Sequence, residues 1–239
     1  MEKQTLLYEG KAKKIYSTED QHTVWVEYKD SATAFNGEKK ATIDGKGRLN
    51  NEITSLMFSM LEENNIPTHF ISKQSPTEQI VQHVTIIPLE VVVRNVVAGT
   101  LAKRTGLPEG HVLHKPIVEF YFKNDDLGDP LFNHDHIEAL ELAAPKQLED
   151  MRELALQVNT ILTAFFTEKK VRLIDFKLEF GNNAKGELLV ADEISPDTCR
   201  LWDSETNEKL DKDVFRRDLG SLTEAYEKIL ERLGGNLHV

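Results

Sequence analysis

The sequence predicts an α+β protein with two lobes, a β-rich lobe over residues 1–84 and a mixed α/β lobe over residues 85–239. Two observations support this division. Strand patterns cluster in the first part of the chain, whereas the longer amphipathic helix patterns come later. No repeat, low-complexity stretch or long linker interrupts the chain. For two lobes packed together, a ligand cleft between them is the default expectation.

The first part of the chain is predicted to form strands around one helix. Alternating patterns at 6–17 and 23–30 flank a polar turn at 18–22, which predicts an antiparallel hairpin. A helix is expected within 43–67, because apolar residues recur there at helical spacing. Further strands are predicted at 69–72, 78–84 and 89–96.

Helices and one hairpin are predicted for the second part. A long amphipathic helix is expected over 145–169, a C-terminal helix over 213–233, and a short helix after Ala98. The C-terminal helix should turn its apolar residues inward. These residues are Phe215, Leu219, Leu222, Tyr226, Ile229 and Leu233.

The composition is that of an ordinary globular protein and excludes several classes of function. The chain has 239 residues, of which 40% are hydrophobic and 29% charged, so it can bury a sizeable core. Its net charge of −11 argues against general binding to nucleic acid or anionic membranes, although local lysines can still bind small anions. We find no membrane span or signal-peptide core, and the single Cys199 excludes an intrachain disulfide. We therefore expect a cytoplasmic protein.

The hairpin between the two long helices carries the first chemical signal. Its first strand is LIDFKLEFG, residues 173–181, in which apolar residues alternate with others. On a strand, the apolar residues would share one face, and Asp175, Lys177 and Glu179 would share the other, each about 7 Å from the next. A solvated sheet face is the simplest interpretation of such a strand.

A second strand is expected to bring more carboxylates to this face. The turn at 182–186 folds the segment ELLVADEIS back, so Asp192 and Glu193 should lie near Lys177 and Glu179. Three or more carboxylates around one lysine cost free energy unless a cation shares the site. Hard oxygen ligands from two strands suit Mg²⁺, which leaves other positions for phosphate oxygens. The alternative is an exposed, salt-bridged hairpin.

Two other segments carry groups that suit phosphates. In YEGKAKKIY, Gly10 lets the backbone approach a ligand, and Lys11 and Lys13 lie on one side of an extended chain. The segment is not a P-loop, and a lysine-rich edge strand would have the same pattern. In VVVRNVVAGTLAKRTG, the Arg94 fork and the Thr100 hydroxyl at the start of a short helix could hold an anion. The alternative there is an ordinary capped helix.

The segment ISPDTCRLWD places Arg200, a second possible phosphate fork, just beyond the acidic hairpin. Cys199 is interpreted as a small buried residue, because no histidine lies near it in the sequence. His134 and His136 could present two imidazoles to zinc from one strand face, but no third ligand is evident. Taken together, the groups fit a nucleotide and a second phosphorylated ligand.

Six segments resemble those of the phosphoribosylaminoimidazole-succinocarboxamide synthase (SAICAR synthetase) family, in the same order. They are GKAKKIY, IIPLEVVVRNVVAGT, KNDDLGDP, LIDFKLEFG, DEISPDTCRLWD and LDKDVFRRDLG. The resemblance covers essentially the whole chain, and LIDFKLEFG followed by DEISPD is highly specific. One departure is Thr100, where the family usually has serine. Threonine keeps the hydroxyl and adds a methyl group, so we expect the phosphate contact to survive.

The resemblance implies an ATP-dependent ligase of de novo purine biosynthesis. Such an enzyme joins 5-amino-1-(5-phosphoribosyl)imidazole-4-carboxylate, here called the ribotide, to L-aspartate in the presence of Mg²⁺. The implied fold has two lobes with ATP in the cleft between them, and its N-terminal lobe is similar to that of protein kinases. A homodimer or another homo-oligomer is expected.

The resemblance also implies roles for individual residues. Those that would cover the ATP phosphates are Gly10, Lys11, Ala12 and Lys13. Those that would hold Mg²⁺ are Glu179 and Asp192, and those for the ribose phosphate are Arg94, Thr100 and Arg200. Those near the imidazole and the reacting groups are Asp175, Lys177 and Lys123. The resemblance assigns no residues to aspartate.

The chemistry of amide formation agrees with this implied activity. A carboxylate is a poor acyl donor, and phosphorylation by ATP is the direct way to activate it.

Two rival functions share some of these groups, a small-molecule kinase and a nucleotide-sensing module. A kinase should carry an Asp base in an HRD-type loop, which is absent. A sensor would need neither two anion forks nor a metal site.

Overall fold

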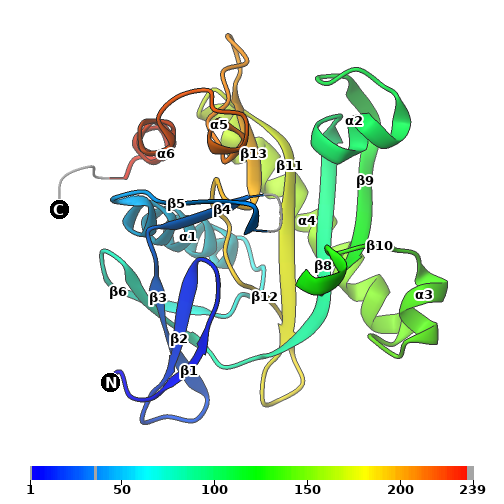
Figure 1. The fold of residues 1–239 in the computed structure, drawn as a ribbon. Helices are drawn as coiled ribbons and strands as arrows, with labels where there is room; N and C mark the ends of the chain where they lie inside the picture. Colours follow the sequence, from blue (N-terminus) through cyan, green and yellow to red (C-terminus); the bar gives the residue numbers. More distant parts are fainter. Residues whose placement is uncertain (1, 35–36, 236–239) are drawn as a thin grey trace.

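The chain forms two antiparallel sheets, one after the other in sequence (Figure 1). The structure is a computed structural model that describes residues 2–34 and 37–235. The first sheet has the strand order β1-β2-β3-β7-β6. Its strands are β1 (Leu6–Glu9), β2 (Lys13–Ser17), β3 (Thr23–Tyr28), β6 (Phe70–Ser75) and β7 (Glu78–Gln82).

The second sheet has the order β10-β9-β8-β11-β12, and β13 also pairs with β11. Its strands are β8 (Thr85–Val96), β9 (Val112–Phe122), β10 (Leu131–Phe132), β11 (Val171–Asn182), β12 (Leu188–Ala191) and β13 (Cys199–Asp203). The register between β8 and β11 sets Glu90 beside Glu179 and Arg94 beside Asp175. Two short strands, β4 (Ser31–Ala34) and β5 (Lys39–Thr42), form a separate hairpin.

Six α-helices lie in the described part of the chain. They are α1 (Lys46–Glu63), α2 (Gly99–Thr105), α3 (His134–Ala139), α4 (Pro145–Glu168), α5 (Asp213–Arg216) and α6 (Leu222–Arg232). A 3₁₀ turn covers Asp125–Leu127. Helix α4 packs on β11 and β8, while α1 packs on α6 and on strand β6 of the first sheet. Within the residues described, no helix is long and apolar enough to cross a membrane.

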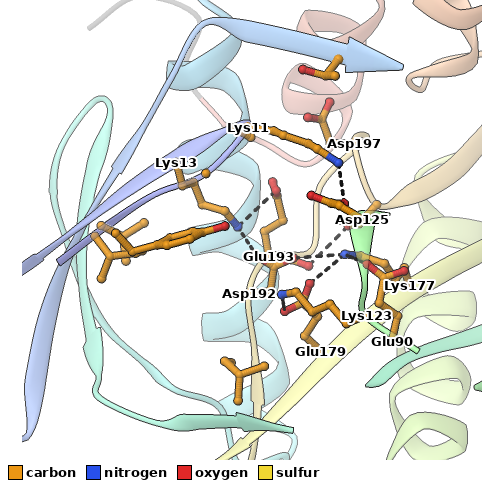
Figure 2. Close-up of a pocket in the computed structure, with 18 of the residues that line it drawn as sticks. Lys11, Lys13, Glu90, Lys123, Asp125, Lys177, Glu179, Asp192, Glu193 and Asp197 are labelled. Carbon is orange, nitrogen blue, oxygen red and sulfur yellow. Dashed lines mark hydrogen bonds and ion pairs between the residues drawn. The ribbon is translucent and has the colours of Figure 1, made fainter. Parts of the chain in front are cut away.

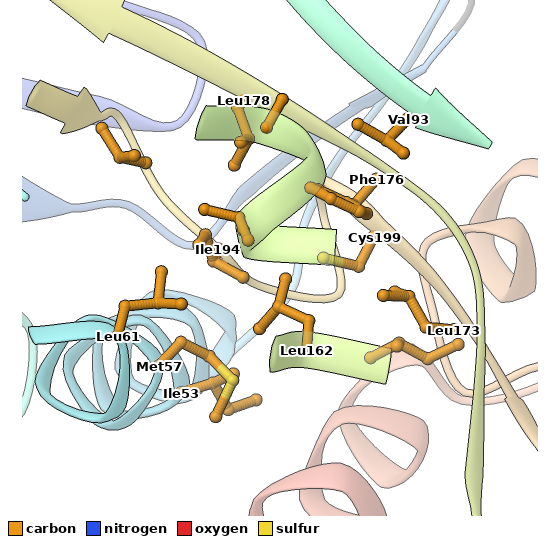
Figure 3. Packing of buried hydrophobic residues seen from close by; sticks show 14 of the residues in the cluster. Ile53, Met57, Leu61, Val93, Leu162, Leu173, Phe176, Leu178, Ile194 and Cys199 are labelled. Carbon is orange, nitrogen blue, oxygen red and sulfur yellow. The ribbon is translucent and has the colours of Figure 1, made fainter. Parts of the chain in front are cut away.

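One continuous hydrophobic core joins the helices to the second sheet (Figure 3). Met57 and Leu61 of α1 lie in the same buried cluster as Leu162 of α4 and Leu178 of β11. Helical spacing places the buried residues of α1 and α4 on one side of each helix, so both helices turn an apolar face to this cluster. The predicted α+β class is confirmed, and both large sheets are antiparallel.

Both faces of β11 are shielded from solvent, although only one is apolar. Phe176, Leu178 and Phe180 point into the core as the alternation predicts. The prediction is wrong for Ile174, which lies in a separate buried cluster, because the register shifts between Leu173 and Asp175. On the opposite face Asp175 and Glu179 are each only 3% exposed. The interpretation as a solvated sheet face is therefore wrong. Burying charged groups costs free energy unless they are paired, so their partners determine what this face can do.

Two predicted elements differ from the structure in detail. The strand at 6–17 is two strands, because the chain turns at Gly10 between β1 and β2. The helix at 213–233 is two helices, α5 and α6. The break between them contains Asp218 and Gly220, both with positive φ, and α6 begins at an N-cap, Ser221, whose side chain accepts from the Glu224 N–H. As a result, Leu219 is exposed and does not point inward.

Candidate active site

A cavity of about 640 Å³ is lined by residues from both sheets. One part of its wall is apolar, and the other is densely charged (Figure 2). The apolar lining residues are Ile15, Val24, Val26, Val81, Val84 and Ile86. The charged part contains residues from β2, β8, β11 and the segment after β12, so strands distant in sequence meet there.

Lys177 on β11 is the centre of the charged part. Its Nζ lies 2.8 Å from Glu90 Oε1, 2.9 Å from Glu179 Oε1 and 3.6 Å from Asp192 Oδ2. Lys177 and Glu179 are two residues apart on one strand face, and Glu90 reaches them from the neighbouring strand. The hairpin brings in Asp192, as predicted from the sequence.

Two further lysines complete the charged part. Lys13 pairs with Asp192 and lies 3.2 Å from Glu193 Oε1, and Lys123 pairs with Glu179. Asp192 has φ 64°, a left-handed conformation that aspartate tolerates better than most residues. We call these seven residues the charged centre: Lys13, Glu90, Lys123, Lys177, Glu179, Asp192 and Glu193. With four carboxylates and three ammonium groups, it carries one excess negative charge.

The pairing fixes the ionisation of this centre. Burial opposes the charged form of Asp192, but the charges of Lys13, Lys177 and Lys123 outweigh it and hold its pKa well below the usual range. Burial likewise opposes the charged form of Lys177, yet its carboxylate neighbours raise its pKa well above the usual value. Both groups are therefore ionised at neutral pH.

The carboxylates of the charged centre have the chemistry of a magnesium site. Glu179 and Asp192 supply hard anionic oxygens, and the excess negative charge favours a cation. In this structure lysines occupy those oxygens, and no group of three or more metal-ligating side chains is formed among the described residues. A metal could bind there only if the lysines paired with other anions.

The turn between β1 and β2 forms one edge of the cavity. Gly10, Lys11, Ala12 and Lys13 all line it. The Gly10 N–H donates to the Lys13 carbonyl at 2.8 Å, which closes a tight turn. Lys11 lies half-exposed and pairs with Asp125 Oδ1 at 2.6 Å. The segment expected to cover phosphates is therefore placed at the cavity.

The predicted phosphate-binding residues form a second cluster around Asp175. Arg94 Nη1 donates to Asp175 Oδ2 at 2.7 Å, and Arg200 Nη1 donates to the same oxygen at 2.9 Å. Arg94 Nη2 also donates to Thr100 Oγ1 at 3.4 Å. At Gly99, which has φ 53°, a Cβ atom would lie 2.5 Å from Arg200 Nη2, so the guanidinium depends on this glycine. This cluster adjoins the charged centre, because Asp175 is two residues from Lys177 on β11.

Several residues at the cavity were not predicted from the sequence. Glu90 could have been found from the sequence. Alternate residues of a strand share a face, so Glu90 lies on the same face of β8 as Arg94, which was predicted. The others give no local signal, since only the fold brings them to the cavity. They are His69, Asp125, Thr198, Lys212 and Arg216.

The alternative zinc site is not formed, and Cys199 is buried. His134 and His136 lie on helix α3 and not on a strand face, and His136 Nδ1 accepts from the Asn133 N–H in a capping box. Cys199 belongs to the core, and burial raises the pKa of its thiol far above the usual value. It is a core residue, as predicted.

His69 makes the stability of the protein depend on pH. Its buried imidazole lines the cavity, and among the described residues its Nε2 has no hydrogen-bond partner. Burial, and then the charge of Lys13, lower the pKa of His69 to about 3. Below about pH 6.5 the unfolded imidazole takes up a proton and the folded one does not, so the free energy of unfolding falls as pH drops from 6.5 to 3. We expect this contribution to approach about 1.4 kcal/mol per pH unit, while Asp211, whose pKa burial raises to about 7, contributes a slope of the opposite sign.

Denaturant unfolding at a series of pH values measures this slope. The slope of His69→Gln should differ from that of the wild type by the His69 contribution, because the variant has no imidazole to protonate. His22→Gln, at an exposed turn, is the matched control and should retain it. The same slope in wild type and His69→Gln would show that another group causes the dependence.

The chain is similar to known proteins over nearly its whole length. A family model described as SAICAR synthetase matches residues 6–233. The phosphoribosylaminoimidazole-succinocarboxamide synthase of Anoxybacillus flavithermus is 68% identical, over 98% of each chain. The crystal structure of the protein of that name from Ehrlichia chaffeensis has a TM-score of 0.94 at 45% identity, and covers 97% of this chain and 99% of its own. A structure described as SAICAR synthetase in complex with ADP has a TM-score of 0.93 at 51% identity, with 96% and 97% covered.

Proposed function

Because the chain belongs to the SAICAR synthetase family, we propose that its cavity is where the ribotide carboxylate and L-aspartate are joined with ATP. The chain is an ATP-dependent, amide-forming ligase of de novo purine biosynthesis, and its products are the succinocarboxamide, ADP and phosphate. We place the reaction in this cavity because the charged centre lies there, with its lysines and carboxylates in contact.

ATP would bind with its base against the apolar wall and its phosphates under the β1–β2 turn. The apolar residues offer a surface for a purine ring, and Gly10 to Lys13 border the charged part. Lys11 and Lys13 would pair with phosphate oxygens in place of Asp125 and Asp192. The ADP in the 51%-identical structure supports a nucleotide in this fold.

Glu179 and Asp192 would hold Mg²⁺. Bound there, the ion would neutralise charge that develops on the transferred phosphoryl group. Lys13, Lys123 and Lys177 would then pair with the phosphates and the ribotide carboxylate. Mg²⁺ would thus replace the lysines at the carboxylates, and the lysines would pair with the substrates. Every buried charge would keep a partner of opposite sign, without which its burial would cost free energy.

The ribotide would bind along β11. Arg94, Arg200 and Thr100 would hold its phosphate, since guanidinium forks bind phosphate with two parallel hydrogen bonds. Asp175 positions both arginines and would face the sugar and imidazole. This arrangement would place the carboxylate of the ribotide near Lys177, which lies two residues beyond Asp175 on the same face of β11.

With the substrates held in these proposed positions, the reaction would take two steps. A carboxylate oxygen of the ribotide attacks the γ-phosphorus of ATP, and ADP leaves. The aspartate amine then attacks the acyl carbon and forms the C–N bond. Phosphate leaves with the carboxylate oxygen and can accept the proton lost by the amine. Lys177 and Lys123 would hold the ribotide carboxylate in line with the γ-phosphorus and offset its charge. Catalysis would therefore come from positioning the reactants and from electrostatic stabilisation.

Release of ADP from the wild-type protein tests this function. We expect continuous turnover, with many ADP released per protein molecule, only when the ribotide and L-aspartate are both present. A kinase would release ADP with an alcohol substrate, and a nucleotide sensor would release none. Turnover that does not need aspartate would contradict the proposed function.

Three features remain predictions from the sequence. They are the assignment of residues 1–84 and 85–239 to separate lobes, the homodimer or other homo-oligomer, and the cytoplasmic location. The break between the sheets, from Gln82 to Thr85, supports the first of them.

A further inference from the structure

Glu119 and Tyr121 of β9 contact Arg94 and have no role in the scheme above. The two residues are two positions apart, so they share one face of the strand. The register pairs Glu119 with Val92 of β8, which sets Glu119 diagonally opposite Arg94 on the neighbouring strand. Only 9% of the Glu119 side chain is exposed, so its carboxylate needs charged partners to offset the cost of burial.

Glu119 and Tyr121 occupy one side of the Arg94 guanidinium. Arg94 Nε donates to Glu119 Oε2 at 2.7 Å, and Arg94 Nη2 donates to the Tyr121 hydroxyl at 3.1 Å. This hydroxyl in turn donates to Glu119 Oε2 at 2.8 Å. Arg94 Nη1 donates to Asp175, and Nη2 also reaches Thr100 Oγ1. Strand β9 therefore holds the guanidinium by its Nε side and leaves the Nη1–Nη2 fork toward Thr100.

Glu119 also holds helix α2, which carries Thr100. Arg104, in the last turn of α2, pairs with Glu119 Oε1, and its Nη1 donates to the Tyr121 hydroxyl at 3.0 Å. Thr100 and Arg104 are four residues apart, so they lie on the same side of the helix. Of the seven residues of α2, only Leu101 is buried. Because the helix has so little apolar contact, its ion pair with Glu119 contributes to its position.

We propose that Glu119 is a positioning residue for the phosphate of the ribotide and that Tyr121 assists it. One carboxylate fixes both groups that would bind the phosphate, the Arg94 fork directly and the Thr100 hydroxyl through Arg104. Neither Glu119 nor Tyr121 needs to touch the substrate, because both act through the two arginines. This inference rests on the proposed function and adds to it the side chains that aim its phosphate-binding groups.

Initial rates of Glu119→Gln test the inference. Glutamine keeps the shape of the side chain and loses the charge that holds both arginines, so the KM for the ribotide should rise about 10- to 30-fold. Phosphate binding is the same before and during the reaction, so kcat should stay within about 2-fold. The KM values for ATP and aspartate should also stay within about 2-fold. Tyr121→Phe, which loses only a hydroxyl, should raise the ribotide KM about 3- to 10-fold.

Two comparisons separate positioning from a general structural effect. The nucleoside form of the ribotide lacks the phosphate, so its kcat/KM should be the same in Glu119→Gln and in the wild type. In an Arg94→Lys background, Glu119→Gln should raise the ribotide KM by less than about 3-fold, because the fork that Glu119 positions is already lost.

Asp203→Asn is the matched control. Asp203 is a carboxylate of similar exposure, 11% for its side chain, and it pairs with Arg232 and does not line the cavity. Its ribotide KM should equal that of the wild type. An unchanged ribotide KM in both Glu119→Gln and Tyr121→Phe would overturn the inference, and so would an equal loss with the nucleoside or a full rise in the Arg94→Lys background. A wild type that turns over neither the ribotide nor its nucleoside would instead contradict the proposed function.

Discussion

Glu179→Gln and Asp192→Asn should each lower kcat at least about 100-fold, the scale for removing one electrostatic stabiliser from a catalytic site. Both changes keep the shape of the side chain and remove a hard anionic oxygen. Each residue would bind Mg²⁺ and pairs with lysines in this structure, Glu179 with Lys177 and Lys123, and Asp192 with Lys13. Steady-state rates across a series of Mg²⁺ concentrations measure the effect.

A loss of folding must be separated from a loss of catalysis. Thermal unfolding of both variants should remain cooperative, because Glu179 and Asp192 line the cavity and belong to no buried hydrophobic cluster. Glu52→Gln is the control, since Glu52 on α1 pairs with Lys73 on β6 and does not line the cavity. Its rate should equal that of the wild type. Near-native activity of either test variant at limiting Mg²⁺ would remove that residue from the proposed metal site.

Arg94→Lys and Arg200→Lys should raise the KM for the ribotide about 10- to 100-fold and leave that for ATP nearly unchanged. Lysine keeps the charge and loses the fork, a cost of about 1–3 kcal/mol for a charge-assisted hydrogen bond. Both arginines donate to Asp175, so each change also leaves that buried carboxylate less well paired. Initial rates with each substrate varied in turn measure the two constants.

Arg172→Lys is the control for these variants. Its guanidinium, near the start of β11, donates to Asn207 at the surface and does not line the cavity. The KM for the ribotide should not change in this variant. A rise in the KM for ATP, with the ribotide constant unchanged, would show that Arg94 and Arg200 hold the nucleotide instead.

The two-residue period of β11 could be read from the sequence because one face had to be apolar. Phe176 and Leu178 point into the core, and the same alternation places Asp175, Lys177 and Glu179 together. The short turn after β11 then determined that Asp192 would return to the neighbourhood of Lys177. Most of the charged centre follows from these two local rules.

Long-range placement could not be read from the sequence. The sequence pattern of β11 does not show that its polar face is buried. This face is covered by elements distant in sequence, such as Lys13 of the first sheet. Asp197 contacts Lys46 from α1 and Tyr226 from α6, and no local spacing links these residues. Lys212 and Arg216 reach the cavity only because the chain breaks after α5, where a single long helix was predicted.

Oxygen-18 placed in both oxygens of the ribotide carboxylate tests the proposed chemistry most directly. If this carboxylate is phosphorylated before aspartate attacks, its oxygen bridges to phosphorus and leaves with the phosphate. The wild-type protein should then release phosphate that carries one labelled oxygen per turnover, which mass spectrometry of the phosphate detects. Direct attack of aspartate on the free carboxylate would send the label to water instead. Unlabelled phosphate during productive turnover would contradict activation of the ribotide at the charged centre.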